Sequence, residues 1–406
     1  MTGVLEGIKV IELGHVVAVP AATATLADWG AEVIKVEALT GELIRGLLKT
    51  HGVKRVIKFA GGDLNWTFEL LNRNKKGLAV NLKTEEGKEV LYRLVRNADV
   101  FISNFELASL KRLKMDYTTL SQLNPGLVYG VLTGYGTKGP DRDERGFDYA
   151  AAWARSGAQH LIAEKGTSPP PQRPGMMDRV VGAHIVGGIL ASLLHREKTG
   201  KGQELEFSLY HTGVWTIAED IQSALAGETL PQNDRTDAAN PIWNTYRTRD
   251  DRWFQLVMLQ ADLQWPGFCQ AIGRPELEND PRFNSLDARD ENREELIHIL
   301  DKVIGSKTAD EWEKSFREND CIYGRVATSA EVISDPQALA NDFFAEIQHS
   351  AAGKTKLVTT PVKFLQNPAS VRGPAPELGQ NTEEILLDLG YSWENIAQLK
   401  EQEVIL

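Results

Sequence analysis

The stretch that most constrains the fold is residues 166–209, where a proline-rich loop leads into one long apolar helix and then into a strand, predicted over residues 204–209. Four prolines stiffen residues 169–174, and the apolar run ends in a basic turn followed by Gly200, a residue type that commonly stops a helix. Each glycine in a helix interior costs about 1 kcal/mol, so several of them predict close approach by another backbone or a ligand. They are Gly182, Gly187 and Gly188.

Asp178 stands where this loop meets the helix. An aspartate before an apolar run is typical of a helix N-cap, because its oxygens can accept the free N–H groups of the first turn. The positive end of the helix dipole also favours the ionised carboxylate. A carboxylate at such a junction, beside small residues, suits nucleophilic attack on a carbonyl. Most capping aspartates have no second role, so the position alone leaves both interpretations open.

The N-terminal residues predict the edge of a parallel sheet. Residues 8–13 and 32–37 are apolar strands, and residues 21–29 form a helix between them that Gly30 ends. A strand–helix–strand unit of these lengths gives parallel strands joined by a right-handed crossover. Ligands in such sheets bind beyond the carboxyl ends of the strands, which here is the loop of residues 15–20. A plain connecting loop explains the same residues.

Further strands and helices continue this α/β pattern. We predict a helix over residues 84–97, strands over 99–102 and 127–132, and a helix that begins within 146–157. Gly134, Gly136 and Gly139 have the spacing of a dinucleotide-binding loop, but Pro140 and a charged run follow instead of the required helix. We therefore reject a dinucleotide site and predict a glycine-rich loop over an active site.

A polar segment marks a change of domain near residues 227–241. The next residues predict a hairpin and amphipathic helices, which together form a small α/β domain at about residues 232–327. From Ser329 the chain returns to the first domain and closes with helices at residues 382–389 and 393–402. The predicted division is 1–226 for the N-terminal part of the large domain, 227–328 for the small domain and its linkers, and 329–406 for the returning part.

Residues 175–210, GMMDRVVGAHIVGGILASLLHREKTGKGQELEFSLY, resemble the central motif of the class III CoA-transferases, the CaiB/BaiF family. The run LLHREKTGKGQ is the most specific part, and the similarity extends from Leu5 to the C-terminus. The resemblance implies a Rossmann-like large domain built from both chain ends, and a dimer whose two chains interlock. It also places Asp178 on the nucleophilic aspartate of the family.

The resemblance implies contacts with coenzyme A (CoA) at four segments. The backbone of the loop that begins at His15 would pack on the adenosine of CoA, and Lys75 and Arg112 would contact its phosphate groups. The residues concerned are His15, Val16, Val17, Ala18, Asn72, Asn74, Lys75, Asn104, Phe105, Arg112, Gly134 and Gly136. A basic cluster over residues 49–58 could add positive charge. Ala38 and the segment 106–108 depart from the family pattern.

The composition limits the classes of molecule that the protein is expected to bind. A net charge of −11 argues against nucleic acid or an anionic membrane surface as the main partner. The eight histidines have no metal-ligand spacing, so we expect no metal, and Cys269 and Cys321 read as small core residues. No signal peptide or membrane-spanning stretch is predicted, and a cytoplasmic protein is the simplest interpretation.

The resemblance, taken with these observations, implies an enzyme that moves CoA from an acyl-CoA donor, such as succinyl-CoA, to a free carboxylic acid. Asp178 would form an aspartyl anhydride and then an aspartyl-CoA thioester, without a permanently bound cofactor, and N–H groups near residues 134–139 could stabilise oxyanions. An α-methylacyl-CoA racemase is one alternative, although Phe147 replaces its acid/base histidine. The other alternative is a CoA-binding subunit that pairs with a homologous chain in a hetero-oligomer, whereas we expect a homodimer.

Overall fold

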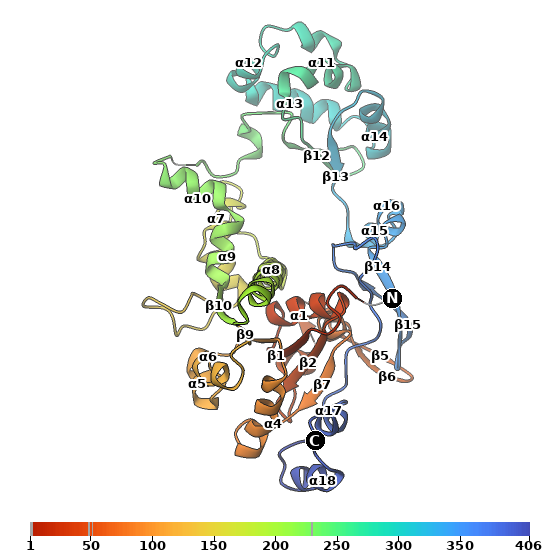
Figure 1. Ribbon diagram of the computed structural model, residues 1–406. Helices are drawn as coiled ribbons and strands as arrows, with labels where there is room; N and C mark the ends of the chain where they lie inside the picture. The colour runs from red at the N-terminus through yellow and green to blue at the C-terminus, as the bar shows by residue number, and fades with distance from the viewer. Residues whose placement is uncertain (1–2, 48, 51, 229) are drawn as a thin grey trace. The chain divides into compact units, whose positions relative to one another are not determined.

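The computed structural model describes residues 3–47, 49–50, 52–228 and 230–406. The chain divides into two compact units (Figure 1). The large unit contains the residues up to His160, Pro171–Leu230 and Ala340–Leu406. The small unit contains Leu161–Pro170 and Pro231–Leu339. Both ends of the chain therefore contribute to the large unit.

Six parallel strands form the central sheet of the large unit, in the order β10-β9-β8-β1-β2-β7. The strands are β1 (Lys9–Leu13), β2 (Glu32–Glu37), β7 (Lys76–Ala79), β8 (Val100–Ser103), β9 (Val128–Thr133) and β10 (Gln203–Ser208). The five strands expected from the sequence are confirmed to within one residue at each end, and so is the parallel β1–β2 pair. The strand order reverses between β1 and β8, which is where such sheets bind ligands.

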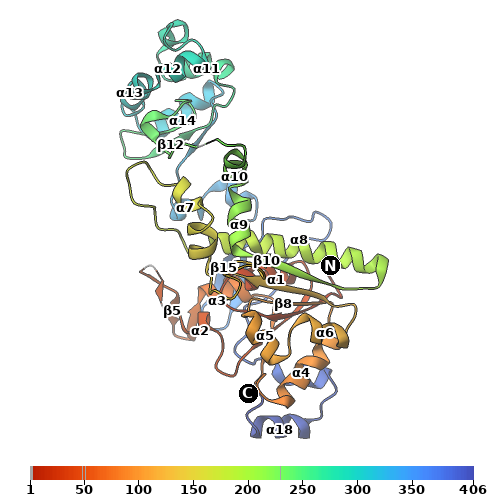
Figure 2. The ribbon, with the colours of Figure 1, turned by 90° about the vertical axis from the view of Figure 1, so that its left-hand side faces the viewer.

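Helices cover both faces of this sheet (Figures 1 and 2). One apolar core joins the sheet to α1 (Ala18–Asp28), α8 (Met176–Thr199), α9 (Leu209–Thr216) and a π-helix at Asp148–Ala154. The other core joins it to α4 (Glu85–Arg96), α5 (Leu107–Leu113), α6 (Tyr117–Leu123), α17 (Thr382–Asp388) and α18 (Trp393–Glu401). The last two helices bring Ile385, Leu386 and Ile396 into that core, so the C-terminal residues complete the unit.

Of the three glycines of α8, only Gly182 lies close to another backbone as expected, whereas Gly188 lies against a side chain. An added Cβ at Gly182 would lie 3.4 Å from the Ala18 carbonyl oxygen of α1, and at Gly188 it would lie 3.0 Å from the Phe207 ring. Gly187 faces open space within 4 Å. Helix α8 therefore packs closely on α1 and β10 through its small residues.

Among the described residues, helix α8 alone is long and apolar enough to cross a membrane by length and composition. Half of its apolar window, 50%, is buried inside the protein. This burial is what the core helix of a three-layer α/β unit requires, and the apolar face is used against α1 and the sheet.

The small unit has its own core around a three-stranded antiparallel sheet, β11 (Thr245–Arg247), β12 (Trp253–Leu256) and β13 (Tyr323–Arg325). The predicted hairpin is confirmed by the β11–β12 pairing. Its helices are α11 (Ala261–Ala271), α12 (Leu286–Glu291), α13 (Arg293–Ile304) and α14 (Ala309–Glu318), with α15 (Ser329–Val332) and α16 (Pro336–Ala340) following. The aromatic side chains Trp265, Phe268, Trp312 and Phe316 fill the core.

The remaining elements are short. Residues 43–72 carry α2 (Leu43–Gly46), the two-residue pair β3 (Lys49–Thr50) and β4 (Val53–Lys54), the hairpin β5 (Val56–Phe59) and β6 (Gly62–Asn65), and α3 (Trp66–Asn72). Elsewhere lie α7 (Ala158–Leu161), α10 (Ala218–Leu225), and the hairpin β14 (Phe344–His349) and β15 (Gly353–Val358).

Candidate active site

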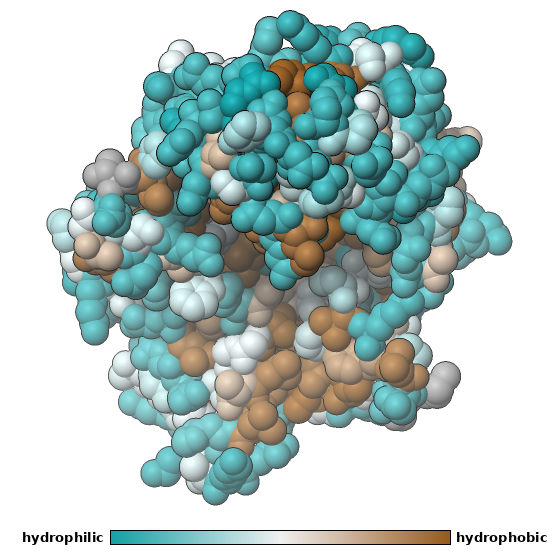
Figure 3. All heavy atoms as spheres, turned by 90° about the horizontal axis from the view of Figure 1, so that it is seen from above, coloured by the Kyte–Doolittle hydropathy of each residue, from teal (hydrophilic) through white to brown (hydrophobic). Residues whose placement is uncertain are grey.

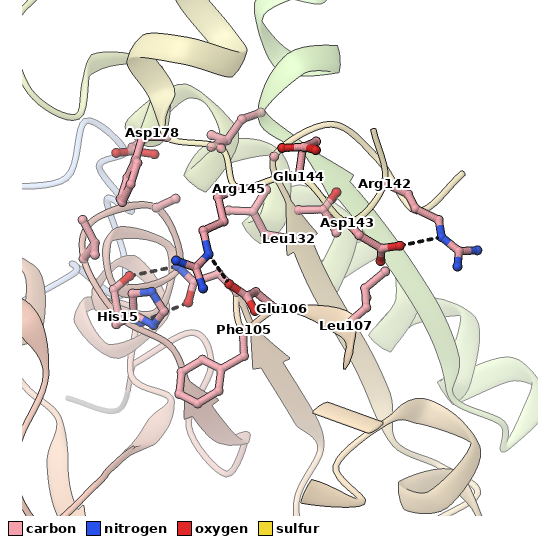
Figure 4. A pocket seen from close by; sticks show the side chains of 18 of the residues that line it. His15, Phe105, Glu106, Leu107, Leu132, Arg142, Asp143, Glu144, Arg145 and Asp178 are labelled. Carbon is pink, nitrogen blue, oxygen red and sulfur yellow. Dashed lines mark hydrogen bonds and ion pairs between the residues drawn. The ribbon is translucent and has the colours of Figure 1, made fainter. Parts of the chain in front are cut away.

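A cavity of about 260 Å³ opens in the large unit where the strand order reverses, beyond the carboxyl ends of β1, β8 and β9 (Figure 4). Its floor comes from the turn after β1 and the segment after β8. Residues 142–147 and the first turn of α8 line it as well. Figure 4 shows Asp178 at one side of this cavity and His15 and Phe105 at another.

Asp178 is the third residue of α8, not its cap. The N-cap is Gly175, whose φ of 72° is left-handed, and no side chain caps the helix. The predicted capping role of Asp178 is therefore wrong, because glycine turns the chain three residues earlier and places the carboxylate inside the first helical turn. A group in the first turn faces the cavity and still lies in the positive end of the helix dipole.

The Asp178 carboxylate is buried without a hydrogen-bond partner among the described residues, and only 8% of the residue is exposed. Burial and, to a smaller degree, the nearby Asp148 carboxylate outweigh the opposing Arg179 guanidinium and raise the pKa of Asp178 to about 7. Desolvation therefore outweighs the helix dipole that was expected to favour the ionised form. Near neutral pH the protein holds a poorly solvated carboxylate that is partly ionised, which is a suitable state for a nucleophile.

Asp148 is a second acid beside Asp178, and it was missed in the sequence. It begins the π-helix, is 3% exposed, and accepts hydrogen bonds from the backbone N–H groups of Tyr149 and Gly175. Burial raises its pKa, and its Oδ2 atom has no hydrogen-bond partner among the described residues. Only its place at the start of the helix predicted within 146–157 could have drawn attention to it.

The turn after β1 is fixed by Asn104, which follows β8. The Asn104 amide accepts the His15 N–H at 3.0 Å and donates to the His15 carbonyl at 2.9 Å. The His15 ring lies 5.3 Å from the Phe105 ring, and burial lowers the pKa of His15. The imidazole is therefore neutral at physiological pH and lines the cavity as a weakly polar surface.

Lys75 does not reach the cavity, which corrects its predicted contact with phosphate. Its ammonium group is fully buried and binds Glu12 Oε2 at 2.7 Å, the Pro20 carbonyl at 3.0 Å and Asn72 Oδ1 at 3.0 Å. Lys35 binds the other oxygen of Glu12 at 2.9 Å. All three donor positions of Lys75 are used inside the protein, so no proton is left for a ligand.

Most, but not all, of the predicted contact residues come together. The cavity is lined by the predicted His15, Val16, Val17, Ala18, Asn104, Phe105, Gly134 and Asp178. The predicted Asn72, Asn74, Lys75, Arg112 and Gly136 lie outside the cavity lining. The Asn74 amide donates to Asp28 and to the Ser370 carbonyl, and it accepts the N–H groups of Arg372 and Gly373. Arg112 donates to Ser109 on the surface of α5. Of the basic cluster, Arg55 is buried and donates to Thr67.

The glycine-rich segment after β9 is shaped by backbone contact. An added Cβ at Gly134 would lie 2.8 Å from the Cα of Gly146, so the two backbones cross here because neither residue has a side chain. The Gly136 N–H is already donated to Thr133 Oγ1 at 2.9 Å, so it cannot stabilise an oxyanion as expected. Regular structure resumes only at Asp148, well after Gly139.

Comparison with known proteins agrees with this geometry. Residues 5–382 match the sequence model of CoA-transferase family III, so the chain belongs to the class III CoA-transferases. It is 37% identical to (R)-2-hydroxy-4-methylpentanoate CoA-transferase of Clostridioides difficile, over 99% of each chain. It is 34% identical to cinnamoyl-CoA:phenyllactate CoA-transferase of Clostridium sporogenes, over 100% of this chain and 98% of the relative.

A solved structure shows the same fold. The CAIB/BAIF family protein from Brucella suis superposes with a TM-score of 0.84 at 28% identity, over 96% of this chain and 100% of the other. The family expected from the central motif is thus confirmed, together with the enzyme class and the mixed α/β fold around a parallel sheet.

The raised pKa of Asp178 predicts that this residue costs stability. The folded protein keeps a proton up to pH about 7 that the unfolded chain, with a usual value of 3.8, has released. Stability therefore falls as pH rises from about 4 to about 7, and the cost is largest above that range. Asp178→Asn should raise the melting temperature at pH 8, and the gain should shrink steadily toward pH 4.

Thermal unfolding at several pH values measures this difference. Glu86→Gln, in the exposed first turn of α4, is the matched control, and its effect should not change in the same way with pH. Equal melting temperatures for wild type and Asp178→Asn at pH 8 would contradict the prediction.

Proposed function

We propose that this protein transfers CoA from an acyl-CoA donor to a free carboxylic acid, with Asp178 as the covalent nucleophile. The observation that carries the proposal is a buried carboxylate with no internal partner, placed in the cavity at the reversal of the sheet in a chain of this family. A carboxylate held this way retains its nucleophilicity because neither water nor a cation stabilises it fully.

The reaction balances in four steps. An oxygen of Asp178 attacks the thioester carbonyl of the donor, the carbon–sulfur bond breaks, and a mixed anhydride and the CoA thiolate form. The thiolate attacks the aspartyl carbonyl and releases the donor acid, which leaves an aspartyl-CoA thioester. The acceptor carboxylate attacks that thioester and gives a second anhydride, from which the thiolate takes the acceptor acyl group. Asp178 returns as a carboxylate, and no proton or electron is gained or lost.

Asp148 assists this cycle in the proposed mechanism. Its carboxylate raises the pKa of Asp178 and binds the Gly175 N–H at the start of α8. The first attack converts the charged Asp178 carboxylate into a neutral anhydride, and the aspartyl group stays neutral until the last step, so the repulsion between the two acids is relieved in every intermediate. The environment therefore favours the covalent intermediates relative to the free carboxylate.

The acceptor that the cavity and the relatives support best is a 2-hydroxy acid with an apolar side chain. The names of two relatives specify such acids, one branched and one aromatic. Apolar side chains line the same cavity as Asp178, namely Val17, Leu107, Leu132 and Leu209. We propose an acyl-CoA donor, with succinyl-CoA as the first one to test, and a cytoplasmic enzyme without a permanently bound cofactor.

Substitution of Asp178 tests the nucleophile. Asp178→Ala and Asp178→Asn should lower transfer by several orders of magnitude because no covalent intermediate can form. Mass spectrometry after mixing protein with acyl-CoA and hydroxylamine should modify the wild-type peptide that contains Asp178. Glu86→Ala, in the first turn of α4, controls for loss of a helix-end acid. A tenth of wild-type activity in folded Asp178→Ala would contradict the assignment.

Phe147 excludes the racemase alternative in this proposal. It lines the cavity with 58% of its surface exposed, and a phenyl ring cannot take up or release a proton. We expect no deuterium wash-in at the α-carbon of a 2-methylacyl-CoA in heavy water without an acceptor acid. Mass spectrometry of the recovered thioester measures it, and exchange as fast as transfer would overturn the expectation.

We also propose that two chains interlock, as a homodimer or with a homologous second chain. Large apolar side chains remain exposed on the large unit, including Trp215 at 63%, Leu225 at 76% and Leu365 at 85%. Brown apolar patches lie among the hydrophilic surface in Figure 3. An interlocked pair should bury far more than the roughly 2,000 Å² at which obligate interfaces begin.

Such a pair should not dissociate on dilution unless it unfolds. Sedimentation at nanomolar concentration should give a species near twice the chain mass of 45.0 kDa. A folded species of 45.0 kDa would contradict interlocking. If the chain is instead an inactive CoA-binding subunit, sedimentation should still give a species near twice the chain mass, but no donor should support CoA transfer.

A further inference from the structure

The turn that lines the cavity after β1 has an unusual backbone. Val16 has a φ of 67°, in the left-handed region that β-branched residues rarely adopt. Such a conformation persists only where the surrounding structure fixes it, and it is concentrated at functional sites. Because Val16 lines the same cavity as Asp178, the contacts that hold it bear on the site.

The Val16 backbone is held by Glu42, from the segment after β2. Glu42 Oε2 accepts the Val16 N–H at 2.8 Å, and Glu42 Oε1 lies 2.8 Å from the Lys35 ammonium. Only 5% of the Glu42 side chain is exposed. The neighbouring residue, His15, is fixed from the other side through Asn104. The turn is therefore clamped between the segments that follow two neighbours of β1.

Glu42 in turn has little freedom to move. Lys35 is fully buried and also binds Glu12 Oε1 at 2.9 Å and the Gly14 carbonyl at 3.1 Å. Lys75 binds the second oxygen of Glu12. Two carboxylates and two ammonium groups thus alternate in a buried chain of zero net charge. Moving one member would leave a buried charge unpaired, which is strongly unfavourable.

The turn is connected to the nucleophile by direct packing. An added Cβ at Gly175 would lie 2.9 Å from Cγ1 of Val17, so the side chain next to Val16 presses on the N-cap of α8. Asp178 follows three residues later in the first turn of that helix. A shift of the Val16 turn would therefore displace the start of α8 and the carboxylate.

We propose that Glu42 is a positioning residue that keeps Val16 in its left-handed conformation and thereby sets the place of Asp178. The proposal rests on the CoA-transfer function proposed above. It extends the site beyond the cavity, because Glu42 does not line the cavity and acts through the Val16 N–H and Val17. A purely structural role, in which Glu42 only neutralises Lys35, is the competing explanation.

Glycine at residue 16 separates the two explanations. Glycine adopts positive φ without a steric cost, so Val16→Gly should reduce the need for the clamp. If Glu42 positions the turn, Glu42→Ala should lower kcat for transfer about tenfold or more, and Val16→Gly in that background should recover at least about threefold. If Glu42 only stabilises the fold, the added glycine should leave the loss unchanged or deepen it.

Asp28→Ala is the matched control. Asp28 is a buried carboxylate at the end of α1 that pairs with Arg73 at 2.7 Å, and it does not contact the turn. Val16→Gly should not rescue its loss of stability or activity. Glu42→Gln keeps an oxygen for the Val16 N–H and removes only the charge beside Lys35. It should retain most of the transfer activity if Glu42 positions the turn, and lose it as Glu42→Ala does if neutralising Lys35 is the only role, so this variant tests the proposal even where the alanine variant does not fold.

Hydrogen exchange of residues 14–20 in the absence of substrate gives a second readout. The Glu42 carboxylate protects the Val16 N–H, so Glu42→Ala should exchange faster there while α4 stays unchanged. This readout stands even if no transfer is found, so failure of the proposed function and failure of the clamp are distinguishable. Unchanged exchange, or no rescue by Val16→Gly, would overturn the proposal.

Discussion

The large unit depends on the buried pairing of Glu12 with Lys35 and Lys75. These residues lie in β1, in β2 and directly before β7, so one carboxylate joins three neighbouring segments of the sheet. Burial opposes its charge, but the two ammonium groups prevail and lower the pKa of Glu12 to about 2. Thr23 of α1 also donates to Glu12 at 2.5 Å, which ties the first helix to the same point. Desolvation is costly here, and complete pairing offsets it.

Asp178 shows how burial changes the pKa of a carboxylate that has no ion-pair partner within the described part of the chain. Its pKa rises to about 7 whereas that of Glu12 falls to about 2, although both carboxylates are buried in one unit. The difference is direct contact with cations: Glu12 binds two ammonium groups, whereas for Asp178 the effect of the Arg179 guanidinium is smaller than that of burial and of the Asp148 carboxylate. The paired charges of Glu12, Lys35 and Lys75 thus stabilise the sheet, whereas the Asp178 carboxylate stays without an ion-pair partner among the residues described and lines the cavity.

The sequence predicted the elements that follow from local patterns. The strands of the sheet and Asp178 at the start of α8 come from apolar runs and from a loop–helix junction, both of which are local. It did not predict the role of Lys75, because a lysine in a polar stretch reads as exposed, and its partner Glu12 lies 63 residues away. The capping glycine, the acid at the start of the π-helix and the strained Val16 also depend on tertiary contacts.

The mouth of the cavity sets a final constraint on any anionic ligand. Arg145 pairs with Glu106 at 2.9 Å and Arg142 with Asp143 at 3.0 Å, so the two cations of the lining segment already have acidic partners (Figure 4). These pairs are exposed and contribute little to stability. Their effect is on binding, because the chain carries a net charge of −11 and offers no long-range attraction to a polyanion. A phosphate that reaches either arginine would share the guanidinium with a carboxylate, which weakens the attraction. Neutral contacts with the residues that line the cavity therefore matter more for an anionic ligand here than attraction to these two arginines.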